Sequence, residues 1–104
     1  MSWTRLLPAA EVPAGTAKSV RVGLDDLLVC SLSEETFHVV ENVCSHDDAP
    51  LGDQELDGCQ VTCPRHGARF DITNGAVLKS PAPVGIEAYP TRILEGWVEA
   101  NLEG

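Results

Sequence analysis

The sequence is poor in basic residues. Only 7 Lys and Arg stand against 16 Asp and Glu, which gives a formal net charge of −9. Nucleic-acid binding needs clustered cations that neutralise phosphates, so seven scattered ones exclude a basic binding stripe. An acidic surface suits docking onto a basic patch of another protein, although solubility alone is the simpler explanation of the charge.

The sequence also lacks long apolar runs. None approaches the ~20 residues that a membrane-spanning helix requires. The segment from Met1 to Pro8 has no charged leader followed by an apolar stretch, so it does not match a secretory signal. We therefore expect a cytoplasmic, monomeric protein with no membrane partner. Its 104 residues suffice for one domain, 1–104.

No stretch shows the apolar spacing of an amphipathic helix, whereas alternating and β-branched segments recur between turn residues. Segments 17–22, 27–32 and 36–41 predict an antiparallel meander. Further strands are expected at 4–7, 54–56, 59–62, 69–72, 76–78, 85–94 and 97–102. Hairpin turns are predicted at Asp57-Gly58, Asn74-Gly75 and Glu95-Gly96. The predicted fold class is all-β.

The chemistry is concentrated in two short segments, Cys44-Ser45-His46 and Cys63-Pro64-Arg65-His66, sixteen residues apart. Each offers one thiolate and one imidazole in a predicted turn, and cysteines in a reducing compartment favour metal binding over disulfides. Two interpretations fit these side chains. One is a closed tetrahedral zinc site; the other is a [2Fe–2S] cluster with both sulfurs on one iron and both imidazoles on the other. A zinc finger usually places its second pair on a helix, and none is predicted here.

The pattern around the ligands resembles that of bacterial Rieske-type ferredoxins. Asn42 to Leu51 is similar to their first cluster loop, and Val61 to Asp71 and Pro81 to Pro83 are similar to later segments. The similarity runs from about Trp3 to the C-terminus. It implies a three-sheet antiparallel β fold with a small cluster-binding subdomain of two ligand loops, at about 42–84.

The same resemblance implies one [2Fe–2S] cluster and its ligands. Cys44 and Cys63 would bind the inner iron, and His46 and His66 the outer, more exposed iron. Reduction would then raise the proton affinity of the two histidines and couple the potential to pH.

Four other positions indicate which kind of Rieske protein the chain resembles. Respiratory and photosynthetic members have an additional cysteine in each cluster loop, and Ala49 and Arg65 stand there instead. Ala68 and Phe70 replace the Ser and Tyr whose hydroxyls bond to sulfur in high-potential members. Because such bonds stabilise the reduced state, their absence predicts a potential towards the bottom of the range of roughly −150 to +300 mV.

The resemblance implies an electron carrier rather than an enzyme. Its partners would be a flavin-dependent ferredoxin reductase and a terminal oxygenase, such as an aromatic ring-hydroxylating dioxygenase. His38 is the only other histidine, so we do not expect a complete oxygenase with its own mononuclear iron. The alternatives are a small subunit of an NAD(P)H nitrite reductase, a structural zinc-binding interaction module, and a redox role in iron–sulfur assembly or another reductase chain.

The remaining candidates have simpler interpretations beside functional ones. Cys30 and Cys59 are expected to be buried free thiols rather than a second metal site or a disulfide. Asp47 and Asp48 either guide a basic partner or are solvated loop residues. The segment from Pro81 to Pro83 is interpreted as a rigid cover over the cluster.

Overall fold

A computed structural model describes residues 3–45, 48–65, 67–79 and 84–103. These residues form β-strands and one short 3-10 helix, η1 (Ala9–Glu11), but no α-helix. The strands are β1 (Trp3–Pro8), β2 (Thr16–Val22), β3 (Asp25–Ser33), β4 (Thr36–Glu41), β5 (Gln54–Glu55), β6 (Gln60–Thr62), β7 (Arg69–Asp71), β8 (Val77–Lys79), β9 (Ala88–Tyr89), β10 (Thr91–Leu94) and β11 (Trp97–Asn101). The all-β prediction is confirmed.

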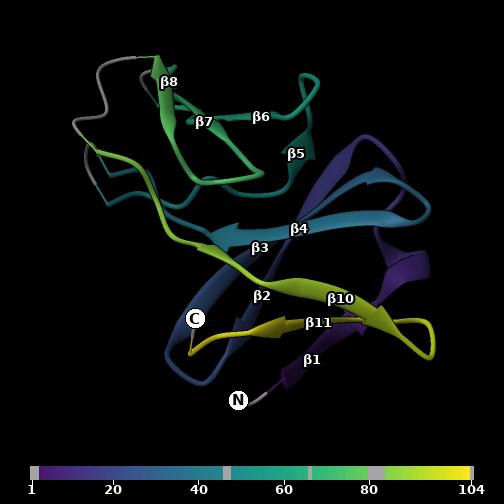
Figure 1. The fold of residues 1–104 in the computed structure, drawn as a ribbon. Coiled ribbons are helices and arrows are strands. Elements are labelled where there is room, and N and C mark those ends of the chain that lie inside the picture. Colours follow the sequence, from purple (N-terminus) through teal and green to yellow (C-terminus); the bar gives the residue numbers. More distant parts are fainter. Residues whose placement is uncertain (1–2, 46–47, 66, 80–83, 104) are drawn as a thin grey trace.

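The strands form three antiparallel sheets (Figure 1). The central sheet has the order β5-β2-β3-β4-β9 and contains the predicted meander, β2-β3-β4. A second sheet, β1-β11-β10, lies at the end of the molecule where the N-terminus begins, and the sheet β6-β7-β8 lies at the opposite end. The predicted hairpins β7–β8 and β10–β11 are both present.

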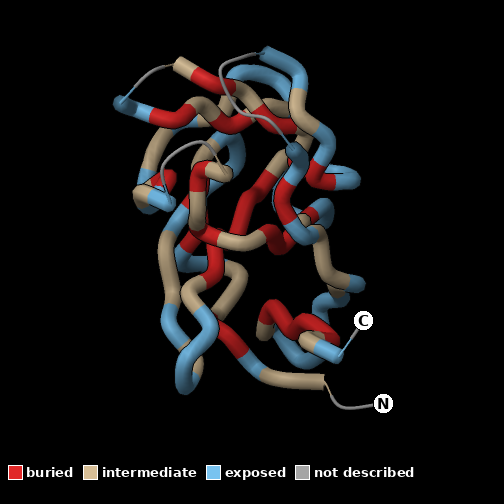
Figure 2. The backbone as a smooth tube through the Cα atoms, turned by 90° about the vertical axis from the view of Figure 1, so that its left-hand side faces the viewer, coloured by how far each residue is buried: buried red, intermediate tan, exposed pale blue. Residues whose placement is uncertain are grey.

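Strand β3 explains how the two ends are joined. Its residues from 27 to 31 are all buried, because both faces of the strand are covered. Side chains alternate between the faces. Leu27 and Val29 pack in the core beneath β1 and β11, whereas Leu28 and Cys30 pack in the core beneath β6 and β7. Figure 2 shows the buried segments running through the interior and the exposed residues at the turns.

The predicted hairpin between 54–56 and 59–62 is wrong. Strand β5 pairs with β2, and β6 pairs with β7, so only the bridge between Asp57 and Gln60 remains of the hairpin. The backbone groups at the outer edge of β6 have other hydrogen-bond partners. The side-chain amide of Gln54 donates to the Thr62 carbonyl at 3.1 Å and accepts from the Thr62 N–H at 2.9 Å.

The predicted strand 85–94 is in fact two strands in different sheets. Strand β9 pairs with β4, and β10 pairs with β11. Pro90 lies between them. Proline has no N–H for a strand ladder, so the chain leaves one sheet there and joins the next.

Helices that could cross a membrane are absent from the described residues. Within 3–45, 48–65, 67–79 and 84–103, none is long and apolar enough to span a bilayer.

Candidate metal centre

Two of the four predicted ligands, Cys44 and Cys63, are brought into one apolar core. Their exposed fractions are 0% and 1%. Cys63 follows β6 directly, and Cys44 lies three residues beyond the end of β4. The residues that share their core are Ala17, Leu28, Cys30, Val40, Leu51, Val61, Ala68, Phe70, Ile72 and Ile86. Two soft sulfur donors therefore lie in an environment that excludes water.

The turns that begin at these cysteines have the same backbone hydrogen bonds. In the first ligand loop (residues 44–49), the Cys44 N–H donates to the carbonyl of Ala49 at 2.7 Å. In the second ligand loop (residues 63–68), the Cys63 N–H donates to the carbonyl of Ala68 at 2.7 Å. Each loop therefore closes on itself five residues after its cysteine.

The fifth residue of each loop completes the match. The N–H of Asp48 donates to the Cys44 carbonyl at 2.8 Å, and the N–H of Gly67 donates to the Cys63 carbonyl at 3.0 Å. Both residues have a left-handed backbone conformation, with φ of 59° for Asp48 and 76° for Gly67. The described residues of the two loops thus share one hydrogen-bond pattern, although in the sequence the histidine is two residues after the cysteine in the first loop and three in the second.

The first ligand loop is also tied to the chain beyond residue 83. The Ser45 hydroxyl donates to the carbonyl of Val84 at 2.5 Å. Further along, the N–H of Glu87 donates to a carboxylate oxygen of Glu41 at 2.7 Å, and the N–H of Glu41 donates to the Glu87 carbonyl at 2.9 Å. These bonds fix residues 84–87 beside the end of β4 and the first ligand loop.

The other predicted ligands, His46 and His66, lie outside the described residues, as do Asp47 and the predicted cover from Pro81 to Pro83. Among the residues described, no group of three or more His, Cys, Asp or Glu is placed to hold a metal. The donor chemistry can still be tested on the two sulfurs. They are buried on matched turns in one core and are not joined in a disulfide. This fits a zinc or iron–sulfur site, both of which take paired thiolates.

The remaining two cysteines differ from one another. Cys30 is buried, and burial raises the pKa of its thiol to about 12, so it acts as a packing residue. Cys59 is exposed, and the prediction that it is buried is wrong. It lies in the turn directly ahead of β6.

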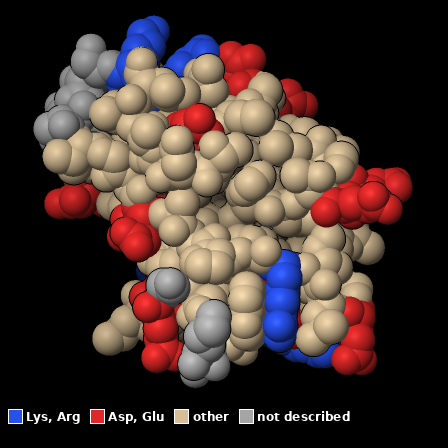
Figure 3. Space-filling model, in the orientation of Figure 1, with Lys and Arg blue, Asp and Glu red and all other residues tan. Residues whose placement is uncertain are grey.

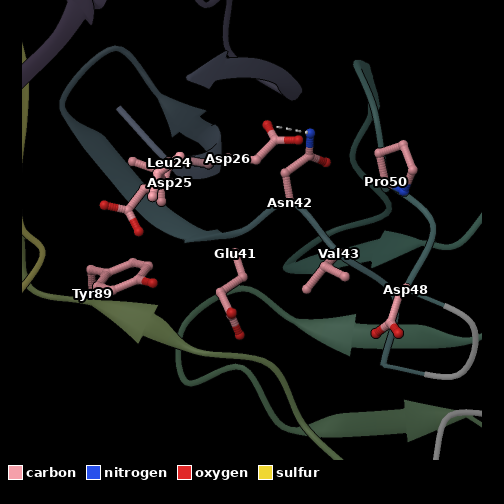
Figure 4. A pocket seen from close by; sticks show the side chains of 10 residues that line it. Leu24, Asp25, Asp26, Glu41, Asn42, Val43, Asp48, Pro50 and Tyr89 are labelled. Atoms are coloured by element: carbon pink, nitrogen blue, oxygen red, sulfur yellow. Dashed lines mark hydrogen bonds between the residues drawn. The ribbon is translucent and has the colours of Figure 1, made fainter. Parts of the chain in front are cut away.

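A hollow of about 310 Å³ lies beside the first ligand loop (Figure 4). It is lined by Leu24, Asp25, Asp26, Leu27, Glu41, Asn42, Val43, Asp48, Pro50 and Tyr89. Partial burial, followed by the charges of Glu41, Asp25 and Glu87, raises the pKa of the Tyr89 hydroxyl.

Acidic side chains spread over the face of the molecule shown in Figure 3 rather than gathering in one patch.

Two polar side chains near the loops were missed by sequence analysis. Asn42 bonds to Asp26 and to the backbone of Gly52. Gln54 bonds to the backbone just after the first ligand loop, at Leu51, and just before the second, at Thr62. No spacing or composition signal distinguishes them, because their partners are mostly backbone groups brought together only by the fold.

Known proteins resemble the chain over nearly its whole length. A family model described as the Rieske [2Fe–2S] domain matches residues 2–90. Ferredoxin CarAc of Metapseudomonas resinovorans is 32% identical over 97 residues, which cover 92% of this chain and 90% of that protein.

Solved structures also resemble the chain over most of its length. The Sphingomonas yanoikuyae B1 ferredoxin has a TM-score of 0.87 and 34% identity, and the match covers 96% of this chain and 98% of that one. A chain in the structure described as "Complex of reduced oxygenase and oxidized ferredoxin in carbazole 1,9a-dioxygenase" has a TM-score of 0.84 and 31% identity, covering 94% and 91%.

Proposed function

The chain belongs to the Rieske [2Fe–2S] domain family, and on that premise we propose that it is a ferredoxin that carries single electrons to a terminal oxygenase. The observation that carries the proposal is the pair of buried sulfurs on two matched loops in one core. A cluster of this type takes up and releases one electron when bound. The chain itself is a carrier and catalyses no substrate conversion.

We assign the ligands to Cys44, His46, Cys63 and His66. The burial of both sulfurs supports the placement of the thiolates on the inner side, since the apolar core behind them is closed to water. The histidines come from the parts of the loops beyond the cysteines, so we assign them to the outer side. We also assign residues 42–84 to a cluster-binding subdomain within the domain 1–104, because β6, β7 and β8 pair only with one another in the described structure.

The described residues perform three tasks in this function. The hydrogen bonds that close the backbone of each loop would hold its sulfur in place as a bound cluster is oxidised and reduced. The core around the sulfurs excludes water, which would otherwise stabilise the more charged state. Ala68 and Phe70, both fully buried in that core, offer no hydroxyl to sulfur, which supports a low potential.

The relatives support an oxygenase as partner. One similar structure is a complex of a ferredoxin with its oxygenase. We propose that this chain likewise delivers electrons to a terminal oxygenase of an aromatic ring-hydroxylating system and receives them from a flavin-dependent reductase. The net charge of −9 would favour docking onto a basic patch of either partner.

The test is an anaerobic reductive titration of the purified chain, followed by mixing with the oxidised terminal oxygenase of the carbazole 1,9a-dioxygenase system. We expect one electron per chain in the titration and reoxidation of the chain by the oxygenase, but not by buffer alone. A colourless chain with stoichiometric zinc would overturn the carrier proposal in favour of a structural zinc module. A chain that accepts an electron but does not pass it on would overturn the oxygenase as partner.

A further inference from the structure

We propose that Gln54 is a positioning residue that sets the placement of the two ligand loops relative to each other. The inference rests on the proposed function, because the loops matter as a pair only if one cluster bridges them. Gln54 itself is not among the proposed ligands, and its side chain acts on backbone groups that lie next to the loops.

The side-chain amide of Gln54 completes the outer edge of β6. Alternate residues of this edge strand direct their N–H and carbonyl groups away from β7. The N–H of Gln60 donates to the Asp57 carbonyl at 3.0 Å, and the Gln60 carbonyl accepts from the Asp57 N–H at 3.1 Å. The same two groups of Thr62 bond to the Gln54 side chain, which accepts from the Thr62 N–H at 2.9 Å and donates to the Thr62 carbonyl at 3.1 Å. Since Thr62 directly precedes Cys63, this contact fixes the start of the second ligand loop.

The same amide nitrogen reaches the end of the first ligand loop. It donates to the Leu51 carbonyl at 3.2 Å, and the Gly52 carbonyl lies 3.5 Å away. Leu51 is buried in the core that holds both cysteines. One primary amide therefore links the backbone just after the first loop to the backbone just before the second.

Asn42 makes the first loop a closed unit on which this link can act. This residue, 5% exposed, lies two positions before Cys44. Its side chain accepts from the Gly52 N–H at 2.9 Å and donates to the carboxylate of Asp26 at 3.1 Å. The two ends of the loop are thereby held together and joined to β3, so a contact at Leu51 and Gly52 is a contact with the loop as a whole.

The backbone of Gln54 is itself fixed in the central sheet. It pairs with Ala17 of β2, and the N–H of Leu56, two residues on, donates to the Gly15 carbonyl at 2.8 Å. Figure 1 shows β5 between the sheet β6-β7-β8 and the long strands β3 and β4. The side chain thus joins three parts of the fold: the central sheet, the end of the first loop and the start of the second.

Only an amide fulfils this role, because both a donor and an acceptor are needed at the end of a side chain of this length. A carboxylate at position 54 accepts from the Thr62 N–H but places an unpaired oxygen against the carbonyls of Thr62 and Leu51. An aliphatic side chain leaves both backbone groups of Thr62 without these bonds.

The test compares Gln54→Leu and Gln54→Glu with Gln60→Leu in the cluster-containing chain. Gln60 is a matched control, because it lies on the same strand as Thr62 and, within the described part of the chain, its side chain accepts only from Arg69, at 3.3 Å. Hydrogen exchange of the peptide containing Thr62 reports the bond directly. The g-values of the reduced chain and its midpoint potential report the placement of the loops.

We expect exchange of the Thr62 N–H to accelerate about tenfold in Gln54→Leu, with changed g-values, a shifted potential and faster loss of visible absorbance on heating. Gln54→Glu tests the same point with the N–H acceptor retained, should the leucine variant not fold. Gln60→Leu keeps the wild-type values. Wild-type g-values and potential in both Gln54 variants would overturn the inference. A wild-type chain without a cluster spectrum would instead overturn the proposed function, before any variant is made.

Discussion

Asp48 and Gly67 occupy the same left-handed position in two different loops. Each is four residues beyond a buried cysteine, and each donates its N–H to that cysteine's carbonyl. Their φ values are 59° and 76°. Asp tolerates this conformation better than most residues, and glycine adopts it without a steric penalty.

This relationship predicts opposite tolerance at the two positions. Gly67→Ala should destabilise the chain by about 1–2 kcal/mol, because a left-handed alanine is strained. Apart from the two neighbouring residues, no atom of the described chain lies within 4 Å of the added Cβ, so the cost is confined to the backbone. Asp48→Gly should change stability by less than about 0.5 kcal/mol, since relief of strain and added chain entropy offset each other. Thermal unfolding midpoints check both, and a larger loss in Asp48→Gly than in Gly67→Ala would contradict the matched-loop description.

Cysteine reactivity should separate the exposed thiol from the buried ones. In the cluster-containing chain at pH 8, iodoacetamide should modify Cys59 alone, because it is exposed. Cys30 should remain unmodified. Burial raises its pKa to about 12, so only about one thiol in ten thousand is ionised at pH 8. Mass spectrometry identifies the labelled peptide, and Cys59→Ser should abolish labelling. Label on Cys30 of the folded chain would contradict the structure.

Acid stability should depend on Glu99 in the sheet β1-β11-β10. Hydrogen bonds from Arg92, at 2.9 Å, and from Arg5, at 3.1 Å, hold the pKa of this carboxyl below its ordinary value of 4.5. The two arginines also stack on Trp97 and Trp3, with Arg5 over Trp97 and Arg92 over Trp3.

Because the pKa is lower in the folded state, the carboxylate stabilises the fold above about pH 4.5, and that contribution is lost as the pH falls through the folded-state value. The difference in unfolding midpoint between wild type and Glu99→Gln should therefore be largest at neutral pH and shrink in acid. Midpoints measured from pH 7 down to pH 3 check this, and a difference that does not vary with pH would refute it.

The proposed low potential should respond to a hydroxyl added at position 70. Phe70 is fully buried in the core that holds Cys44 and Cys63. Phe70→Tyr should raise the midpoint potential by about 40 mV for each ~1 kcal/mol by which the new hydrogen bond favours the reduced state. Tyr89→Phe, which removes a hydroxyl from the hollow beside the first loop, is the control and should leave the potential unchanged. A potential that is unchanged or lower in Phe70→Tyr would contradict the explanation from missing hydroxyls.

Much of the fold could be predicted from local patterns. Alternation and turn residues indicated the meander of β2, β3 and β4 and the hairpins β7–β8 and β10–β11, because those pairings join neighbouring segments. Pro90 is a signal within the predicted strand 85–94 that marks the change of sheet, and it could have been used.

Other features could not be predicted because they depend on segments far apart in the chain. The turn residues at Asp57-Gly58 suit a hairpin, but β5 instead pairs with β2, some 37 residues earlier at Ala17 and Gln54. The side chain of Gln54 makes the hydrogen bonds to the Thr62 backbone that a neighbouring strand would otherwise make. No sequence pattern distinguishes this glutamine from any other. Strand alternation would place Cys59 on the same face as the buried Val61 and Cys63. It lies ahead of the strand, however, and is exposed.

The central claim is that two cysteines and two histidines of this chain hold one [2Fe–2S] cluster. It is tested most directly by low-temperature EPR and ENDOR of the reduced chain, prepared with ¹⁵N-labelled histidine, together with iron and zinc analysis. We predict two irons per chain, a reduced-state signal, and nitrogen couplings from two histidines that are altered in His46→Cys and in His66→Cys. An EPR-silent chain with one zinc, or a cluster signal without histidine nitrogen coupling, would contradict it.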